Sequence, residues 1–151
     1  MFIIFQKSDT DTISLRVVVD LDNILDELQK VKDEYDPDAY ITTAVPDNRI
    51  FRNAWCRCPK GRSVLIDELK AQSLHIDRIR QIRNKKLIEL DAEQLRNITN
   101  SDQLAEIEAR KQLLRDIPQT FDVSRLDIKK PHTLWPEGLD LHRDYLKDQA
   151  Q

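Results

Sequence analysis

The residues best suited to chemistry are the two cysteines, Cys56 and Cys58, which form a Cys-Arg-Cys motif. Two thiolates can bind a metal ion, but a structural zinc site needs four ligands. The other donors of this kind are His75, His132 and His142, whose spacing does not match the cysteines. We therefore predict partly buried thiols, no metal site and no cofactor. A metal-dependent regulator or enzyme that uses Cys56 and Cys58 is kept as the alternative of another class.

The sequence offers no local catalytic arrangement. No Ser/His/Asp or Cys/His combination stands out, and paired carboxylates lack a setting that would perturb them. The chain has only two glycines in 151 residues, which argues against a phosphate-binding loop. His75 lies between Leu74 and Ile76 and is predicted to be a surface or interface residue of a helix. We predict that the protein is not an enzyme and has no catalytic residues.

A basic run, RIRQIRNKK at residues 78–86, raises the possibility of nucleic-acid binding. On a helix, however, its five cations point around most of the circumference and form no stripe that could follow a phosphate backbone. Asp77 and Glu89 flank the run, and the net charge of the whole chain is −3. A solvated helix whose long basic stems cover an apolar stripe is the preferred interpretation.

Composition limits the fold and the compartment. Hydrophobic residues make up 40% of the chain and charged residues 34%, which allows one small core and much solvated surface. No apolar stretch is long enough to cross a membrane, and the start MFIIF lacks the basic leader of a signal peptide. We expect a protein made in the cytoplasm that contacts neither membrane nor nucleic acid.

Residues 1–66 are predicted to form a small mixed α/β module for attachment or oligomerisation. Apolar and β-branched runs predict strands, and apolar residues at helical spacing predict one helix, with Asp22 as its N-cap and Ile24, Leu25, Leu28 and Val31 on its inner face. The helix is expected at 20–35 and the strands at 2–5, 13–19, 39–45, 49–55 and 63–66, with CRCPKGR as a loop.

Residues 67–117 are predicted to form a helical hairpin of two to three helices. Asp67 can cap a helix that runs to about Leu90, and a capping-box pattern predicts a second short helix at 91–98. Ser101 is predicted to cap a last helix at 102–117, which Pro118 would end. The apolar stripes are Leu69, Ile76, Ile79, Ile82, Leu87 and Leu90 on the first helix, and Leu104, Ile107, Leu114 and Ile117 on the last.

Residues 118–151 are predicted to be an extended C-terminal arm, because their apolar residues are spread singly and prolines interrupt them. Trp135 and Pro136 stand in this arm, and a large aromatic side chain there suggests a docking anchor. The alternative is that Trp135 packs back on the chain's own helices. The whole chain is therefore predicted to be α+β: the mixed module, the helical hairpin, then the arm.

The order of several short motifs resembles a known family. The segments FRNAW, KAQSLHIDRIRQIRN and RNKKLIELD, then IEARKQLLRDIP and a later Trp-Pro, resemble bacteriophage tail-fibre assembly chaperones and related phage tail proteins over residues 49–137. The tryptophan that such proteins commonly carry between the two helices is absent here. The resemblance implies a chain that binds tail fibre in the host cytoplasm during assembly, or one that remains in the virion tail between fibre and baseplate.

Both versions need a surface for another protein. Apolar helical stripes on a short hairpin need a partner or another copy of the chain to cover them, so self-association as a homo-oligomer is also expected. The side chains predicted to bind the partner are Leu69, Ile76, Ile79, Ile82, Leu104, Ile107, Leu114, Trp135 and Pro136.

Overall fold

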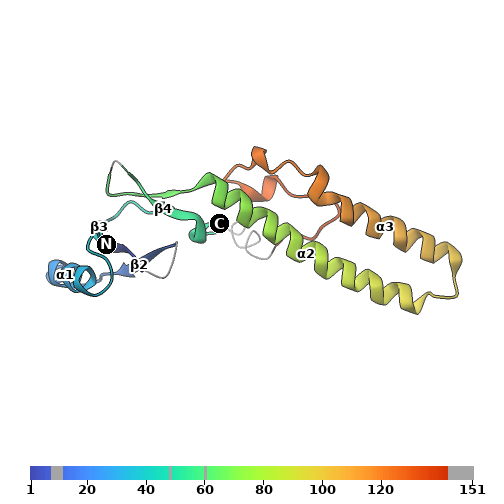
Figure 1. Cartoon of the computed structure of the whole chain (residues 1–151), viewed down its shortest axis with the longest axis horizontal. Coiled ribbons are helices and arrows are strands. Elements are labelled where there is room, and N and C mark those ends of the chain that lie inside the picture. Colours follow the sequence, from blue (N-terminus) through green and yellow to red (C-terminus); the bar gives the residue numbers. More distant parts are fainter. Residues whose placement is uncertain (8–11, 48, 60, 143–151) are drawn as a thin grey trace. The chain divides into compact units, whose positions relative to one another are not determined.

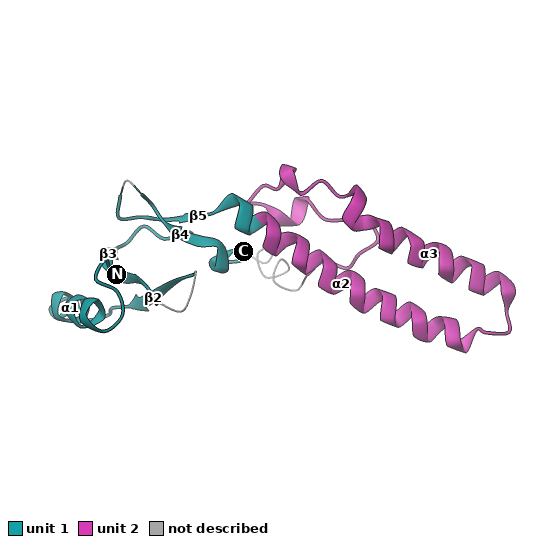
Figure 2. Ribbon diagram, in the orientation of Figure 1, with its two compact units in different colours: residues 1–71 teal, residues 72–151 magenta. Residues whose placement is uncertain are grey.

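The structure, a computed structural model, describes residues 1–7, 12–47, 49–59 and 61–142. The fold is α+β, as predicted: small antiparallel sheets are followed by two long helices (Figure 1). The chain divides into two compact units, residues 1–71 and 72–151 (Figure 2). The hairpin and the C-terminal segment thus share one unit, whereas the sequence suggested separate parts divided at residues 66 and 117.

Unit 1 is built around a three-stranded antiparallel sheet in the order β2-β1-β3. Its strands are β1 (Phe2–Gln6), β2 (Ile13–Val17) and β3 (Tyr40–Thr42). Successive side chains of a strand point to opposite faces, so Ile3 and Phe5 enter one core cluster and Ile4 enters another. The short apolar run of β1 is therefore buried on both faces.

Helix α1 (Ile24–Glu34) belongs to the first of these clusters, where Val31 is fully buried. Asn23 occupies the N-cap position, so the prediction of Asp22 there is wrong. The carboxylate of Asp20 accepts hydrogen bonds from the backbone of Asp22 and the side chain of Asn23, which organises the turn before the helix. The prediction that Leu25 faces inward is also wrong, because its side chain is exposed.

A two-stranded sheet belongs to the second cluster. It consists of β4 (Trp55–Arg57) and β5 (Val64–Ile66), and its Trp55 and Val64 are buried with Ile4. The strand expected at 49–55 is wrong: a turn and the 3-10 helix η1 (Arg52–Ala54) precede β4. The backbone N–H of Ala54 donates to the carbonyl of Phe51, and this tight turn buries Phe51 without a strand. Cys56 accordingly lies in a strand, not in a loop.

Helix α2 (Glu68–Arg96) begins as predicted, because the Asp67 carboxylate accepts a hydrogen bond from the backbone N–H of Lys70. The break predicted near Leu90 is wrong, and the helix continues for another turn and a half. The apparent capping box has another purpose: Asp91 and Gln94 both bind the ammonium group of Lys111 on the next helix.

Helix α3 (Ser101–Thr120) differs from the prediction at both ends. Asn100, not Ser101, is the N-cap, and its side chain accepts from the backbone N–H of Gln103. Pro118 does not end the helix. A proline so near the C-terminus removes one backbone donor, and the last turn is still held by the Phe121 N–H and the Thr120 hydroxyl, which donate to carbonyls one turn back.

The core of unit 2 joins α2, α3 and the segment that follows them. Residues 121–142 contain the 3-10 helices η2 (Val123–Arg125) and η3 (Pro131–Thr133) but no long element. They lie back along the helices (Figure 1), and Leu139 is buried in the core. The extended arm is thus wrong for residues 121–142, while residues 143–151 lie outside the described part. The core consists of Ile79, Leu90, Ile107, Leu114, Ile117 and Leu139.

No helix in the described ranges is long and apolar enough to cross a membrane.

Candidate protein-binding surface

Most of the side chains predicted to bind a partner hold the hairpin together instead. Ile79, Ile107 and Leu114 are buried between α2 and α3. Ile76 and Ile82 pack against the same cluster and are partly buried. A partner could reach these side chains only if the hairpin opened. The periodicity identified an apolar face correctly, but that face is internal.

The remaining predicted residues have different surroundings. Leu104 is half-buried, whereas Leu69 is exposed, so Leu69 is not part of a packing stripe. Pro136 is buried, and Trp135 packs against the core of unit 2. The Trp135 indole N–H donates to the carbonyl of Leu139 at 3.2 Å. In the described structure Trp135 is therefore an internal contact of the C-terminal segment.

His75 anchors the same segment from α2. Its side chain is 0% exposed, its Nε2 lies 2.7 Å from the Leu134 carbonyl oxygen, and its ring meets that of Trp135 edge to face. Burial lowers the pKa of His75; the hydrogen bond to the Leu134 carbonyl opposes this shift, and the nearby charge of Arg78 adds to it. The imidazole is therefore held neutral and donates from Nε2 to the carbonyl. His75 is therefore a buried residue inside unit 2, and the prediction of a helix-surface residue is wrong.

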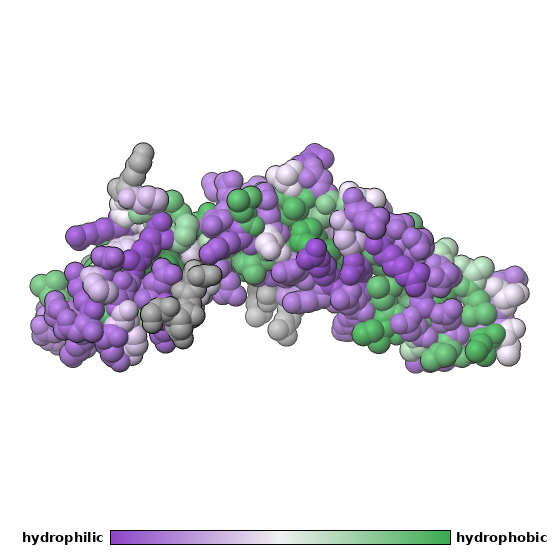
Figure 3. Space-filling model, viewed as in Figure 1, coloured by the Kyte–Doolittle hydropathy of each residue, from purple (hydrophilic) through white to green (hydrophobic). Residues whose placement is uncertain are grey.

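A second group of apolar residues remains uncovered on the last turns of α2 and in the turn that follows it. Ile88, Leu95 and Ile98 have exposed fractions of 68%, 72% and 67%, and Leu87 beside them is half-buried. At about 100° per residue the three helical positions, Leu87, Ile88 and Leu95, fall within an arc of roughly 100°, and Ile98 lies in the turn after α2. We call Leu87, Ile88, Leu95 and Ile98 the distal patch. Figure 3 shows hydrophobic atoms gathered along this half of the hairpin.

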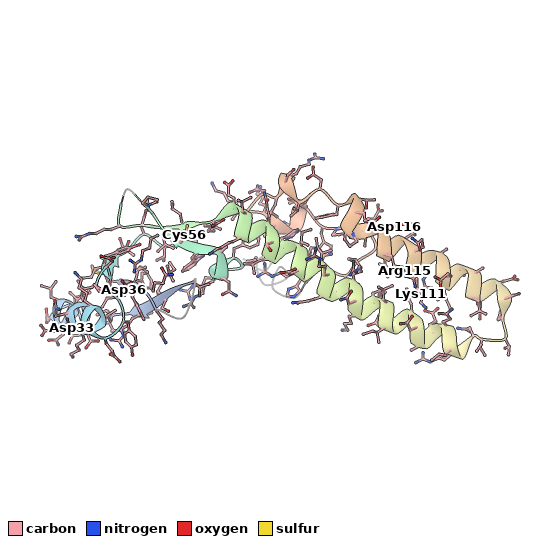
Figure 4. All side chains as sticks on the ribbon, viewed as in Figure 1. Asp33, Asp36, Cys56, Lys111, Arg115 and Asp116 are labelled. Atoms are coloured by element: carbon pink, nitrogen blue, oxygen red, sulfur yellow. The ribbon has the colours of Figure 1, made fainter. Side chains whose placement is uncertain are left out.

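A polar lock fixes the helices beneath the distal patch. The Lys111 ammonium group is buried between α2 and α3 and lies 2.6 Å from the Asp91 carboxylate (Figure 4). The side chain of Gln94 also accepts from Lys111. Arg110 binds Glu93 at 2.8 Å and adds a second link between the helices. These links set the register of α2 against α3, so the distal patch has a defined geometry.

An apolar hollow lies in unit 2, between the two helices and the C-terminal segment. Its volume is about 440 Å³. Leu113, at its edge, is exposed, although it stands beside the buried Ile117. Such an apolar depression can receive an apolar side chain of a partner. The lining residues are Lys86, Leu90, Arg110, Leu113, Leu114, Ile117, Glu137 and Gly138.

Cys56 has little of the character of a reactive thiol. Cys56 and Cys58 are half-buried and not joined by a disulfide bond. Burial raises the pKa of Cys56, and the negative charge of Asp67 raises it further, so the protonated thiol is favoured. Among the described residues there is no group of three or more His, Cys, Asp or Glu side chains that could hold a metal ion.

The basic run on α2 is partly paired along its own helix. Arg80 lies 3.0 Å from the Asp77 carboxylate, and Lys86 lies 3.6 Å from that of Glu89. Arg83 donates to the side chain of Asn84. These exposed pairs fit the solvated-helix interpretation, in which the charges keep the helix surface in water.

A buried ion pair in unit 1 was missed by the sequence analysis. Asp36 is buried, binds the guanidinium group of Arg57, and accepts from the backbone N–H of Gln6 at 2.7 Å (Figure 4). Gln6 is the last residue of β1, where β3 no longer runs alongside it. The Asp36 carboxylate accepts the backbone hydrogen bond that a neighbouring strand would otherwise accept from Gln6. No spacing in the sequence links residues 6, 36 and 57.

The distal patch was missed for a different reason. Ile88 and Leu95 are seven residues apart and share a face, which is a visible signal in the sequence. That face lies opposite Ile79 and Leu90 of the longer stripe, so a prediction based on one packing stripe does not include it.

No family model, curated protein or solved structure matches this chain.

Proposed function

We propose that this chain is a non-enzymatic bacteriophage tail protein that binds tail fibre during assembly, as an assembly chaperone does. The observation that carries the proposal is the exposed distal patch, in which three of the four residues are 67–72% exposed. An apolar patch of this kind on a rigid hairpin is typical of a protein-binding surface. The phage assignment is supported by the order of motifs over residues 49–137.

The geometry favours binding through the outer side of the hairpin. The inner face is occupied by the core, and the C-terminal segment is held by His75 and Trp135. The apolar hollow beside Leu113 offers a place for one large side chain of the fibre. In this proposal the fibre covers Ile88, Leu95 and Ile98, which a chain alone in water would leave exposed.

The test is co-purification of the full chain with the tail-fibre polypeptide of the same phage after co-expression. Leu95→Lys should weaken the complex about tenfold or more, because it places a charge at the centre of an apolar contact. Leu25→Lys is the matched control: Leu25 is also a helical leucine, is 70% exposed against 72% for Leu95, and was not predicted to bind a partner. Binding of fibre that is indifferent to Leu95→Lys would contradict the proposal.

A virion subunit that links fibre to baseplate is the second version of the same proposal. It would use the same patch but keep it covered permanently. The protein content of purified mature particles distinguishes the two versions. A chaperone that leaves after assembly should be depleted from the particles, whereas a linking subunit should remain at a fixed ratio to the fibre.

A further inference from the structure

One edge of strand β2 has no hydrogen-bonded neighbouring strand in the part of the chain that the structure describes. The N–H of Val18 donates to the carbonyl of Met1 at 3.0 Å. Together with the register of the two strands, this bond shows which residues of β2 direct their backbone groups towards β1. Residues 14 and 16 therefore bond to β1, and Ile13, Leu15 and Val17 direct their N–H and C=O groups away from it. Gln6 of β1 fits the same pattern, because its N–H points away from β2 and donates to the Asp36 carboxylate.

This outward row is unoccupied in the part of the chain that the structure describes. β2 has β1 as its one neighbour in the sheet, and no backbone hydrogen bond reaches the outward groups of Leu15 or Val17. Val17 is 60% exposed, whereas Leu15 is half-buried and Ile13 is buried in the second core cluster. None of the three outward residues is charged. The one charge in the strand, Arg16, is bound to Glu27 of α1. An open edge without a protecting charge favours addition of another strand.

We propose that a second copy of this chain pairs with β2, antiparallel, about a two-fold axis at Leu15. In this register Leu15 lies opposite its counterpart, and Ile13 lies opposite Val17 of the second copy. Each outward residue then donates one backbone hydrogen bond and accepts one. The two three-stranded sheets become one continuous sheet across the pair.

The strand is complementary to itself, which favours a second copy over a foreign segment. On one face apolar Val17 meets apolar Ile13 from both sides of the axis. On the other face Ser14 meets Arg16, so like charges do not stand directly opposite each other. A two-fold axis needs this self-complementarity, because the same surface supplies both sides of the contact.

The contact is small. β2 has five residues, so the paired edges bury much less surface than a stable dimer needs, and the association should be weak and dependent on concentration. Sedimentation of the full chain over a hundredfold range of concentration should show a shift from monomer to dimer. A chain that stays monomeric throughout this range would overturn the proposal.

Two variants locate the contact. Val17→Lys should raise the dimer dissociation constant about tenfold or more, because it places a charge on the edge, opposite an apolar residue. Leu25→Lys changes an exposed leucine of α1 in the same unit and should alter the constant by less than about twofold. Equal effects of the two variants would contradict the assignment to β2.

Amide hydrogen exchange tests the register in the unchanged chain, so the result does not depend on how a variant folds. The amides of Leu15 and Val17 should exchange more slowly as the concentration rises. Those of Ser14 and Arg16, already bonded to β1, should not change. A dimer in which Leu15 and Val17 still exchange fast would use another surface, and protection that appears only with fibre present would assign the edge to the fibre. The inference does not rest on fibre binding, which is tested on the distal patch.

Discussion

At the scale of single residues, His75 should make the stability of the folded chain depend on pH. Burial and Arg78 lower its pKa in the folded chain below the ordinary value of 6.5. The unfolded chain therefore binds the proton more readily, and stability falls as the pH drops below about 6.5 towards the folded pKa. Thermal unfolding between pH 7.5 and about 5 should show this loss.

The variant His75→Gln serves as the control for this titration. Its side-chain amide can still donate to the Leu134 carbonyl but binds no proton in this range. The dependence of the free energy of unfolding on pH should therefore be shallower than in the unchanged chain. A slope that is the same in both chains would show that another group titrates.

Trp135 allows the docking and internal interpretations to be separated. Because its ring packs on His75 and on the core of unit 2, Trp135→Ala should lower the free energy of unfolding by about 2–3 kcal/mol. Trp135→Phe keeps a ring and loses the hydrogen bond to Leu139, so it should lose about 1 kcal/mol. Unchanged thermal stability in the alanine variant, with weaker fibre binding, would instead favour the docking anchor.

At the scale of elements, the hairpin depends on the lock between α2 and α3. Asp91→Asn leaves the buried Lys111 ammonium without its carboxylate and should lower the free energy of unfolding by about 1–3 kcal/mol. Lys111→Met keeps most of the side-chain volume without the charge and should stay within about 1 kcal/mol of the parent.

An exposed ion pair provides the comparison for the lock. Glu108→Gln removes the partner of Arg115 on the outer side of α3 and should change the free energy of unfolding by less than about 0.5 kcal/mol. Chemical denaturation of the three variants gives the values. An equal loss in Asp91→Asn and Glu108→Gln would show that burial of Lys111 does not matter.

The elements also show how far the sequence leads. Apolar and β-branched runs were sufficient to predict β1 and β2, and helical spacing of apolar residues was sufficient to predict α1 and most of α2 and α3. Helix ends were less predictable. Asp91 and Gln94 resemble a helix start until Lys111 is seen beside them, and Pro118 stands close enough to the end of α3 to be tolerated.

The candidate surface was less visible to sequence reasoning than the fold. A stripe of isoleucines marks an apolar face, but it does not say whether the cover comes from the chain itself or from a partner. Ile79 and Ile107 are covered within unit 2, whereas Ile88 and Leu95 are not. The difference depends on which side of α2 faces α3, and this depends on contacts such as Lys111–Asp91 that join residues far apart in the sequence.

At the scale of the whole molecule, the two proposed contacts belong to different units. The edge of β2 lies in residues 1–71, and the distal patch lies in residues 72–151. A substitution in one unit therefore tests one proposed contact and leaves the residues of the other contact unchanged. This matches the two expected kinds of partner, a second copy of the chain and a tail-fibre polypeptide, with one surface for each.

The unequal borders of the sheet limit how far such pairing can proceed. On the β3 side only the middle residue of a three-residue strand, Ile41, turns its backbone outward, and beyond it the Asp36 carboxylate already holds the amide of Gln6. The β3 side of the sheet therefore offers no continuous row of backbone groups with which a further strand could pair. Once two copies have joined through β2, neither retains a free β2 edge for a third, so pairing through this edge stops at a closed pair and does not extend into an open fibril.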